Sequence, residues 1–387
     1  MNSPSLARIA FLLFASAGLL NMAGAAATPA SSPVAPATLS ASPTAPDSMP
    51  VKIVELLGDG AAIGKAHAAA LGPVIKALNT LYLGKILGDP LSRALAASAA
   101  MNYESTLRPE HLAEIKALAA AIPISEGDAM LDNSFLDLMP TVACSTITLP
   151  ADASPDHVAR FARNLDFDSF DIADKNSVVL VYHPTGSFSF VTIGWPGMIG
   201  AVSGMNEFGL TLSNMEVPRG MGLVPRGMPY ALLYRCLLEH CKTVAEAVKY
   251  LKDTPRQTAN NLMLMDAAGN RVVVEITPEK ITVRAGQDKT ALISTNHQRG
   301  QDTDTPGKCD RYDFLNATAH QIYGKIGPTQ LISMLSRVQQ SGLTMQSMIF
   351  EPANRVIYLA AGSNSADRKF TRLALAPYFK APSPAVK

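Results

Sequence analysis

The chain changes its hydrophobic pattern at Thr141, and this change limits the folds open to it. Before Thr141, apolar residues recur mainly with helical spacing, and after it they recur in short runs, several with the period-two alternation of strands. Two more helical stretches follow late in the chain, at 311–322 and 328–338. Helices, then a long run of antiparallel strands, then a helical pair indicate an α+β fold with four layers, helix–sheet–sheet–helix (αββα).

Residue patterns place the individual elements. A short strand from Val51 opens the folded part, and Ser125 and Thr243 are expected helix N-caps. The other expected helices are 61–83, 91–103, 109–121, 126–136 and 229–251, the last broken at Thr243. The expected strands are 143–149, 157–163, 177–183, 187–194, 209–215, 261–265, 271–276, 280–284 and 291–295, with a last pair around Met348 and 356–359.

The first 50 residues resemble an export signal followed by a linker. Arg8 precedes an apolar stretch at 9–20, and Ala23-Gly24-Ala25 is the small-residue pattern that signal peptidases accept. The stretch is shorter than the roughly 20 residues that span a bilayer, so we expect a cleaved signal peptide over 1–25, with an uncleaved anchor as the alternative. Residues 26–50, rich in Pro, Ala and Ser, are expected to be an extended linker. The mature protein is then periplasmic or secreted, without a membrane span.

The composition of the chain indicates which classes of ligand it can bind. The 387 residues include 33 Lys and Arg against 32 Asp and Glu, and 48% are hydrophobic, which is ample for a sizeable core. A nearly neutral protein has no electrostatic case for binding nucleic acid or an anionic membrane surface. We therefore expect a small-molecule or peptide-scale ligand, and the oligomeric state stays open.

Known nucleotide and metal motifs do not fit the chain. Gly58 and Gly64-Lys65 are separated by the wrong spacing for a phosphate-binding loop or a dinucleotide fingerprint, and Ala66 stands where a hydroxyl is needed. No HExxH, paired CxxC or GxSxG pattern occurs. Cys236, His240 and Cys241 are a conceivable metal set, but a helix packed on the core is the favoured interpretation. No cofactor and no metal are predicted.

The most informative residues are Cys144 and the segment one hairpin later. A Cys that begins a strand is usually a small buried hydrophobe. Here 162–168 follows with Arg163 and Asp166, and an antiparallel hairpin could return both charges beside the thiol. The guanidinium would favour a thiolate, and the carboxylate could hold an ammonium group in place.

Several blocks together resemble the N-terminal nucleophile (Ntn) cysteine hydrolases. This group includes choloylglycine hydrolases, acid-ceramidase-like amidases and the penicillin acyltransferase-like self-processing enzymes. The resemblance runs in the family's order from about Leu56 to beyond Leu359, and its opening is closest to the acyltransferase-like branch. The blocks that carry it are Leu57-Gly58-Asp59-Gly60 with Gly64 and His67, Ala143-Cys144-Ser145-Thr146, Arg163-Asn164-Leu165-Asp166-Phe167, Gly204 to Leu210 with Asn214, Asn261 to Glu275, Ser294-Thr295-Asn296-His297, and Pro306-Gly307 with Asp310-Arg311-Tyr312.

The resemblance implies a precursor that cuts its own chain between Ala143 and Cys144. Residues 51–143 become a helical propeptide, which is a candidate partner chain, and 144–387 become the catalytic domain of the αββα Ntn sandwich. Cys144 is then the nucleophile, and its freed α-amine is the base, because an unperturbed α-amine has a pKa of about 7.7 to 8.0. The implied reaction is hydrolysis of, or acyl transfer from, a small linear amide.

Other roles follow from the same resemblance. Arg163 lies near the thiolate, Asp166 orients the α-amine, and Asn296 donates to the tetrahedral oxyanion. Asn214 contributes to the oxyanion hole or to substrate placement, and Arg311 supports the charge network. Cys309 stands where relatives carry a small hydroxyl residue, which weakens the Arg311 assignment.

Two alternatives stay open. One is a catalytically silent exported binding protein on the same fold. The other is a papain-like Cys/His protease using His297, which the strand-like start at Cys144 disfavours. The acyl and amine parts of the substrate and the disulfide state of Cys236, Cys241 and Cys309 are undetermined by the sequence. Trp195, Phe188, Phe190 and Phe208 are candidates for an acyl pocket or for the core.

Overall fold

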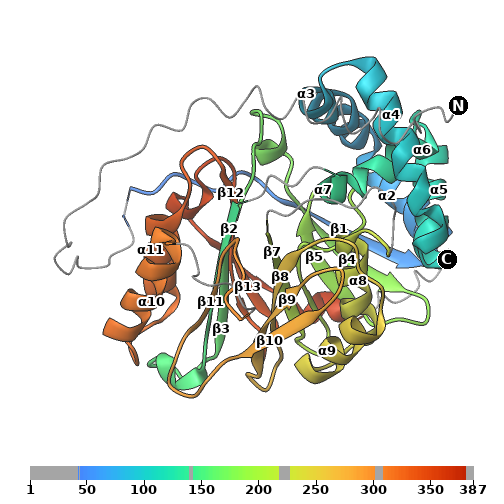
Figure 1. The fold of residues 1–387 in the computed structure, drawn as a ribbon. Helices are drawn as coiled ribbons and strands as arrows, with labels where there is room; N and C mark the ends of the chain where they lie inside the picture. The colour runs from blue at the N-terminus through green and yellow to red at the C-terminus, as the bar shows by residue number, and fades with distance from the viewer. Residues whose placement is uncertain (1–41, 43, 139–142, 218–226, 301–307, 381–387) are drawn as a thin grey trace, which may run out of the picture.

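The structure is a computed structural model that describes residues 42, 44–138, 143–217, 227–300 and 308–380. In this part of the chain two sheets face each other between helical layers (Figure 1). The fold class expected from the sequence, α+β with four αββα layers, is therefore confirmed. The expected signal peptide and most of the linker lie outside the described residues, as do Pro306 and Gly307.

One sheet has eight strands in the order β1-β4-β5-β6-β7-β8-β9-β10. Every neighbouring pair in it is antiparallel except β1 with β4, which run parallel. The strands are β1 (Lys52–Gly58), β4 (Val178–Pro184), β5 (Phe190–Gly194), β6 (Ser203–Asn206), β7 (Thr211–Glu216), β8 (Asn260–Met265), β9 (Arg271–Ile276) and β10 (Ile281–Ala285).

The other sheet has six strands, all antiparallel, in the order β11-β2-β3-β12-β13-β14. Its strands are β2 (Ala143–Leu149), β3 (Arg160–Asp166), β11 (Leu292–Ser294), β12 (Thr344–Glu351), β13 (Val356–Ala361) and β14 (Thr371–Ala374). Thr146 of β2 donates a hydrogen bond to the Met215 sulfur of β7 at 2.7 Å, so these two strands meet where the sheets pack.

Helices cover both outer faces. The helices α8 (Tyr230–His240) and α9 (Val244–Asp253) lie on the eight-stranded sheet, and α10 (Asp310–Gln321) and α11 (Pro328–Val338) lie on the six-stranded sheet (Figure 1). Thr243 caps α9 by accepting from the Glu246 N–H, as its sequence predicts. Because each sheet is covered on both faces, most of its inner strands are buried at every position.

The segment before Cys144, called the pro-segment below, is partly a sheet strand and mostly helices. Its helices are α2 (Gly60–Ala77), α3 (Leu83–Leu87), α4 (Pro90–Ala100), α5 (Pro109–Ala121), α6 (Glu126–Asp132) and α7 (Phe135–Leu138), and a π-helical turn, Leu78–Tyr82, separates α2 from α3. Its strand β1 pairs with β4 over the whole length, Lys52 opposite Val178 through Gly58 opposite Pro184. The pro-segment is therefore built into the sheet of the domain that follows it.

Some elements differ from the sequence expectation. The strand β3 begins at Arg160, not at His157, because His157 has a positive φ of 52° and closes a turn. The strands β6 and β14 were not expected, since Ser203–Asn206 has little β propensity and forms a strand by pairing between β5 and β7. The linker also ends in contact with the domain, since the Met49 N–H donates to Ala361 at 2.9 Å.

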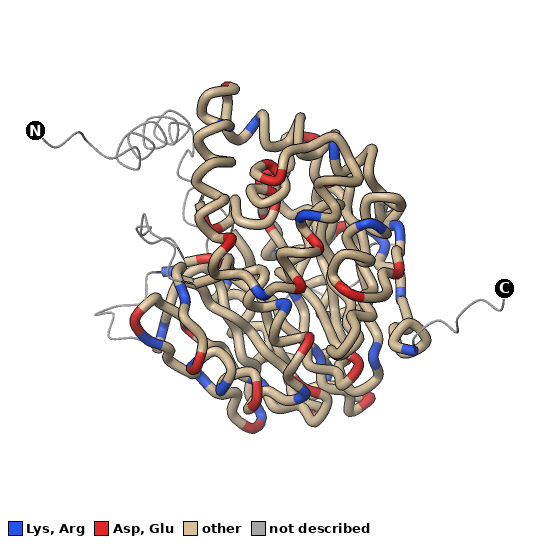
Figure 2. The backbone as a smooth tube through the Cα atoms, turned by 90° about the vertical axis from the view of Figure 1, so that its right-hand side faces the viewer, with Lys and Arg blue, Asp and Glu red and all other residues tan. Residues whose placement is uncertain are grey.

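Charged residues are dispersed along the described chain. In the view of Figure 2, basic and acidic residues alternate without a large region of one sign. Among the described helices, none combines the length and the apolar character needed to cross a bilayer. These observations give no reason to assign a polyanion as ligand.

Candidate active site

Cys144 is the second residue of β2 and is fully buried. It lies opposite Leu165 of β3, and its neighbour Ala143 lies opposite Asp166. The hairpin therefore returns the Arg163 to Asp166 segment beside the thiol, as the sequence predicts. The backbone of Cys144 is held on both sides. The Cys144 N–H donates to Asn296 Oδ1 at 2.8 Å, and the Cys144 carbonyl accepts from Arg311 Nη1 at 2.6 Å.

Arg163 is the charged group closest to the thiol. It lies opposite Thr146 in the antiparallel register, on the same face of the sheet as Cys144, because residues two apart share a face. Its Nη2 donates to Cys144 Sγ at 3.3 Å, and its Nη1 donates to Ser203 Oγ at 2.7 Å. Burial raises the pKa of the Cys144 thiol in this uncut chain, and the Arg163 charge opposes that shift.

Asp166 lies on the other side of the hairpin. Residues three apart in a strand point to opposite faces, so the side chains of Asp166 and Arg163 leave β3 on different sides. The Asp166 N–H still hydrogen-bonds the Cys144 thiol, and the Asp166 charge adds to the rise in the pKa of that thiol. Its carboxylate accepts from Thr344 Oγ1 at 2.5 Å and lies 3.6 Å from Arg311 Nη1. Burial raises the pKa of Asp166 to about 6, and the hydrogen bond from Thr344 and the charge of Arg311 limit the rise. The carboxylate is thus beside the Ala143–Cys144 junction.

Asn296 and Arg311 are distant from Cys144 in the sequence but contact its backbone in the structure. Asn296 follows β11, which pairs with β2, and its Oδ1 accepts from both the Cys144 N–H and Arg311 Nη2, the latter at 3.1 Å. Its Nδ2 donates to the Glu216 carbonyl at 2.8 Å. Arg311 is in the first turn of α10, directly above β2. The structure therefore brings Asn296, Arg311 and Asp166 together around the backbone of Cys144.

A cavity lies beside this cluster. Arg163 and Asn214, the predicted residue from β7, are in its wall, and most of the remaining wall is apolar. The other lining residues are Leu78, Tyr82, Leu83, Asp132, Phe135, Leu136, Leu165, Phe167, Ala173, Trp195, Pro196, Met198, Val202 and Tyr230. An apolar wall with a few polar side chains at one end is typical of a site for a small organic ligand.

The pro-segment forms one side of this cavity. Leu78, Tyr82 and Leu83 come from the π-helical turn and α3, and Phe135 and Leu136 come from α7. Sequence reasoning did not find this wall, because helix periodicity shows which face is apolar but not what that face covers. A π-helical turn inside a helix is often associated with a functional site. Of the four aromatic candidates, Trp195 lines the cavity, whereas Phe190 stacks on Tyr182 at 4.7 Å in the core.

The rival Cys–His pair exists in the structure, but with another cysteine. His297 hydrogen-bonds the Cys309 thiol, which is the N-cap of α10, and the Thr295 hydroxyl lies 3.6 Å from the same sulfur. Burial opposes ionisation of Cys309, but hydrogen bonds from His297, the Tyr312 N–H and Thr295 lower its pKa to about 6. Since Cys144 lies in a strand and pairs with Arg163, this arrangement gives no support to a papain-like site at Cys144.

We expect Cys309 to be the first thiol to react with iodoacetamide at pH 7 in the uncut chain. All four cysteines are free, and Cys309 is partly exposed with a lowered pKa, whereas burial raises the pKa of Cys236 and of Cys241 to about 12. Peptide mass spectrometry of the native protein should show labelling of Cys309 at least about tenfold faster than of the two buried thiols. Cys309→Ser is the control, and equal labelling of all sites would contradict the assignment.

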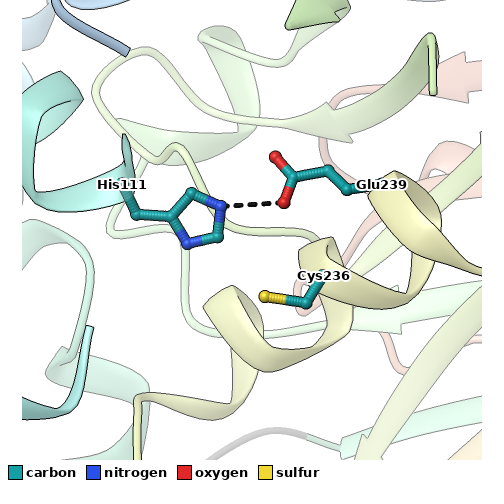
Figure 3. A group of neighbouring side chains, drawn as sticks. All are labelled: His111, Cys236 and Glu239. Carbon is teal, nitrogen blue, oxygen red and sulfur yellow. Dashed lines mark hydrogen bonds and ion pairs between the residues drawn. The ribbon is translucent and has the colours of Figure 1, made fainter. Parts of the chain in front are cut away.

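Three other side chains could be mistaken for a metal site. His111, Cys236 and Glu239 offer ligand atoms within 4.8 Å of one another (Figure 3). However, Glu239 Oε2 lies 2.9 Å from His111 Nε2, and Glu239 Oε1 accepts from Arg235 Nε at 2.8 Å. The fixed guanidinium balances the carboxylate and repels a further cation. We therefore assign His111 and Glu239 to a hydrogen-bonded contact between α5 and α8, beside the ion pair of Glu239 with Arg235.

The metal set considered from the sequence does not assemble either. Among the described residues, the one cluster of ligand-type side chains contains Cys236 but neither His240 nor Cys241. Cys241 ends α8 and lies on the far side of that helix turn, since five residues correspond to a rotation of about 140° from Cys236. Packing on the core accounts for both thiols, which are buried.

Two facing sheets between helices, with a buried thiol at the start of an internal strand and a guanidinium beside it, define the class of cysteine Ntn hydrolases. Enzymes of this class hydrolyse amides or transfer acyl groups. The family model "Acyl-coenzyme A:6-aminopenicillanic acid acyl-transferase" matches residues 154–366, more than half of the chain. The chain therefore belongs to this family, and the branch predicted from the sequence is confirmed. The match begins after Cys144 and spans Arg163, Asp166, Asn214, Asn296 and Arg311.

Solved structures of similar shape have low sequence identity to this chain. A Caenorhabditis elegans ortholog of N-acylethanolamine-hydrolyzing acid amidase is 15% identical, with a TM-score of 0.44, covering 54% of this chain and 93% of that one. A mutant form of conjugated bile acid hydrolase from Clostridium perfringens is 16% identical, with a TM-score of 0.43 and coverage of 60% and 93%. Penicillin V acylase from Agrobacterium tumefaciens is 16% identical, with a TM-score of 0.40 and coverage of 56% and 82%. No curated protein sequence matches the chain.

Proposed function

We propose that this chain is an exported precursor that cuts itself between Ala143 and Cys144 and then cleaves, or transfers the acyl group of, linear amides. The observation that carries the proposal is the environment of Cys144. Its thiol accepts from Arg163 at 3.3 Å, and its backbone N–H and carbonyl are fixed by Asn296 and Arg311. A residue held on both sides of its backbone has little freedom, which favours reaction in one geometry.

The position of Cys144 directly after Ala143, with its backbone held by Asn296 and Arg311, supports self-cleavage. The Cys144 sulfur attacks the Ala143 carbonyl carbon, and the acyl group moves from the Cys144 nitrogen to sulfur as that nitrogen takes up a proton. Water then attacks the thioester, which releases the carboxylate of Ala143 and returns the thiol. The freed α-amine keeps Asn296 Oδ1 as a hydrogen-bond acceptor, and Asp166, beside the junction, supplies a carboxylate to orient it.

Turnover uses the same two groups of Cys144. The α-amine takes the thiol proton while the sulfur attacks the substrate carbonyl, and the protonated amine later gives its proton to the leaving amine. Water, or an acceptor amine, then releases the acyl group. Asn296 and Asn214 are the proposed donors to the oxyanion, Arg163 stabilises the thiolate, and Arg311 with Asp166 holds the charge balance around the new N-terminus.

The apolar wall of the cavity supports the proposal that the cavity binds the acyl part of the substrate and that this part is apolar. Its wall is aromatic and aliphatic except for a few polar groups near Cys144 and the carboxyl of Asp132. The matched family name speaks of acyl transfer to 6-aminopenicillanic acid, and the structures of similar shape carry names of amide-cleaving enzymes. To identify the substrate class, the processed protein is assayed with a panel of fatty N-acyl amides, conjugated bile acids and penicillin V.

Export and the fate of the pro-segment are part of the proposal. The leader at 1–25 directs the chain to the periplasm or beyond. After signal removal and the cut before Cys144, the chain 26–143 stays attached through the non-covalent contacts of its described residues. Support comes from β1, which is an edge strand of the eight-stranded sheet, and from the pro-segment wall of the cavity.

The test is the intact mass of the protein expressed as residues 26–387. We expect two chains, the larger beginning at Cys144, and co-elution of both in size-exclusion chromatography. A single uncut chain that is stable for days would contradict self-processing. If the protein is cut but turns over no substrate of the panel, the alternative of a catalytically silent binding protein on this fold would be favoured.

We expect Asn296→Ala to lower kcat by about 10² to 10³, because one oxyanion donor is lost. The same change removes the acceptor for the Cys144 nitrogen, so self-cleavage should also slow. Processed and unprocessed fractions are separated before the assay, so that kcat refers to cut protein only. The control is Asn354→Ala, whose side chain donates to Glu351 Oε2 at the β12–β13 turn, at the end of the six-stranded sheet opposite Cys144. Wild-type kcat in Asn296→Ala would remove Asn296 from the oxyanion site.

A further inference from the structure

One polar atom near the catalytic end of the cavity has no role in the proposed reaction. Tyr230, the first residue of α8, lines the cavity together with Arg163 and Asn214 and is only 4% exposed. Its hydroxyl is buried and has no hydrogen-bond partner among the described residues. Buried hydroxyls are usually hydrogen-bonded, so one without a partner calls for an explanation.

The same cavity collects further atoms of this kind. Arg163 Nε and Asn214 Oδ1 are also buried without a partner among the described residues. These atoms come from β3, β7 and α8, which are far apart in the sequence. Polar groups that converge on one cavity without satisfying one another are expected where a bound ligand supplies the partners.

Tyr230 is firmly held, although its hydroxyl is free. Its backbone N–H points to the Asp137 carboxylate, 3.2 Å from each oxygen, and its ring packs on Tyr234 at 5.5 Å between centroids. Asp137 belongs to α7 of the pro-segment, close in sequence to the Ala143–Cys144 bond. The pro-segment therefore positions the tyrosine.

The phenol is a donor at physiological pH. Burial, followed by the charges of Glu216 and Asp137, raises the pKa of Tyr230 well above its usual value, and Tyr234 and Cys144 add to the rise. A protonated phenol can donate one hydrogen bond and keeps its proton during the reaction. Tyr230 lines the same cavity as Arg163, which donates to the Cys144 sulfur at 3.3 Å.

We propose that Tyr230 is a further catalytic residue, whose hydroxyl donates a hydrogen bond to the carbonyl oxygen of the bound amide as Cys144 attacks it. The inference rests on the proposed function, because it needs Cys144 to be the nucleophile. It adds a donor from α8 to the two asparagines and explains why the cavity tolerates an unpaired hydroxyl. No proton is transferred from Tyr230, so its effect is on the stability of the oxyanion.

The test compares Tyr230→Phe with Tyr234→Phe in cut protein. Tyr234 is the matched control, because it is one turn further along α8 and its hydroxyl is bonded to Asn260. The probe is a series of N-acyl p-nitroanilides with acyl chains of increasing length. For the member that wild type cleaves fastest, Tyr230→Phe should lower kcat by about 10²-fold with KM changed less than about threefold. Tyr234→Phe should keep kcat within about twofold of wild type.

Stability provides an independent readout. Tyr230→Phe removes an unpaired hydroxyl and should leave the urea midpoint unchanged or higher, whereas Tyr234→Phe breaks a hydrogen bond and should lower it. Tyr230→Phe with wild-type kcat, or a Tyr230→Phe protein that fails to fold, overturns the inference. Wild type that is cut but inactive on every p-nitroanilide, bile-acid conjugate and penicillin overturns the proposed function, and the inference with it.

Discussion

Cys144→Ala should remain a single uncut chain and should have no measurable turnover. Without the sulfur, the neighbouring described side chains offer no replacement nucleophile for the acyl shift, because Arg163 is a hydrogen-bond donor and the Asp166 carboxylate is engaged with Thr344 and Arg311. The variant also lacks the nucleophile for substrate. Intact mass after several days at room temperature and assays with the amide panel measure the two losses separately.

Controls separate self-cleavage from cutting by a contaminating protease. Cys309→Ala and Cys236→Ala should be processed at the wild-type rate, since neither thiol contacts Cys144 in the described structure. Cys144→Ser tests the nucleophile chemically, because a hydroxyl in the same place should cut slowly or not at all at neutral pH. Processing of Cys144→Ala as fast as wild type would assign the cut to an outside protease.

Local patterns in the sequence predict the elements that are set by local chemistry. The helix α5 has the bounds Pro109–Ala121 expected from Pro109 in its first turn, and β2 has the bounds 143–149 expected from its apolar run. Ser125 caps α6, where it accepts from the Asp128 N–H at 3.0 Å. In these cases the neighbouring residues in the sequence supply the interactions that define the element.

Features set by distant residues were not predictable in the same way. The strand β6 exists because β5 and β7 flank it, and the turn around His157 shifts the start of β3. In the site, one hairpin brings the Arg163 side chain to the Cys144 thiol, and this contact was predictable from the sequence. The resemblance to the family indicated Asn296 and Arg311. The wall from Leu78 to Leu136 and the hydroxyl of Tyr230 had no sequence signal, because an apolar or aromatic residue in a helix is ordinarily assigned to the core.

The pro-segment is attached through a buried ionic network as well as through β1. Arg235 of α8 lies between two acids, with Nε 2.8 Å from Glu239 Oε1 and Nη1 2.8 Å from Glu114 Oε2 of α5. The second contact is close but not aligned as a hydrogen bond, since both Glu114 oxygens lack hydrogen-bond partners. His111 of α5 completes the network at Glu239. The side chains of Arg235, Glu239, Glu114 and His111 are at most 2% exposed. Water therefore cannot stabilise their charges, and the charged groups stabilise one another instead.

The charge states follow from this arrangement. Burial opposes ionisation of Glu239, but the charge of Arg235 and the contact with His111 lower its pKa to about 2. Burial raises the pKa of Glu114 to about 7, with Arg235 limiting the rise. Arg235 also lies over the Tyr182 ring, 4.6 Å from the centroid, which is a second favourable contact for a planar cation. Arg235 thus contacts and charge-balances both buried carboxyl groups.

Arg235→Met should therefore lower the free energy of unfolding by about 3 to 5 kcal/mol, because it leaves Glu239 as a buried charge without its partner. In cut protein the same change should release the pro-segment, since Glu114 and His111 are on one chain and Arg235 is on the other. Urea unfolding of uncut Cys144→Ala measures the first effect without interference from cleavage. Size-exclusion chromatography of cut protein measures the second.

Matched variants show whether the cause is the unpaired charge. Replacing the three charged members of the network, Arg235→Met with Glu239→Leu and Glu114→Leu, should recover most of the loss, because apolar side chains need no partner in a buried site and His111 loses only one hydrogen bond. Arg235→Lys should recover less, since an ammonium cannot bridge the two acids or lie flat over Tyr182. The exposed pair Lys249–Asp253 on α9 is the surface control, and Lys249→Met should leave unfolding unchanged. Equal losses in Arg235→Met and the triple variant would mean that packing volume, not charge, holds α5 on α8.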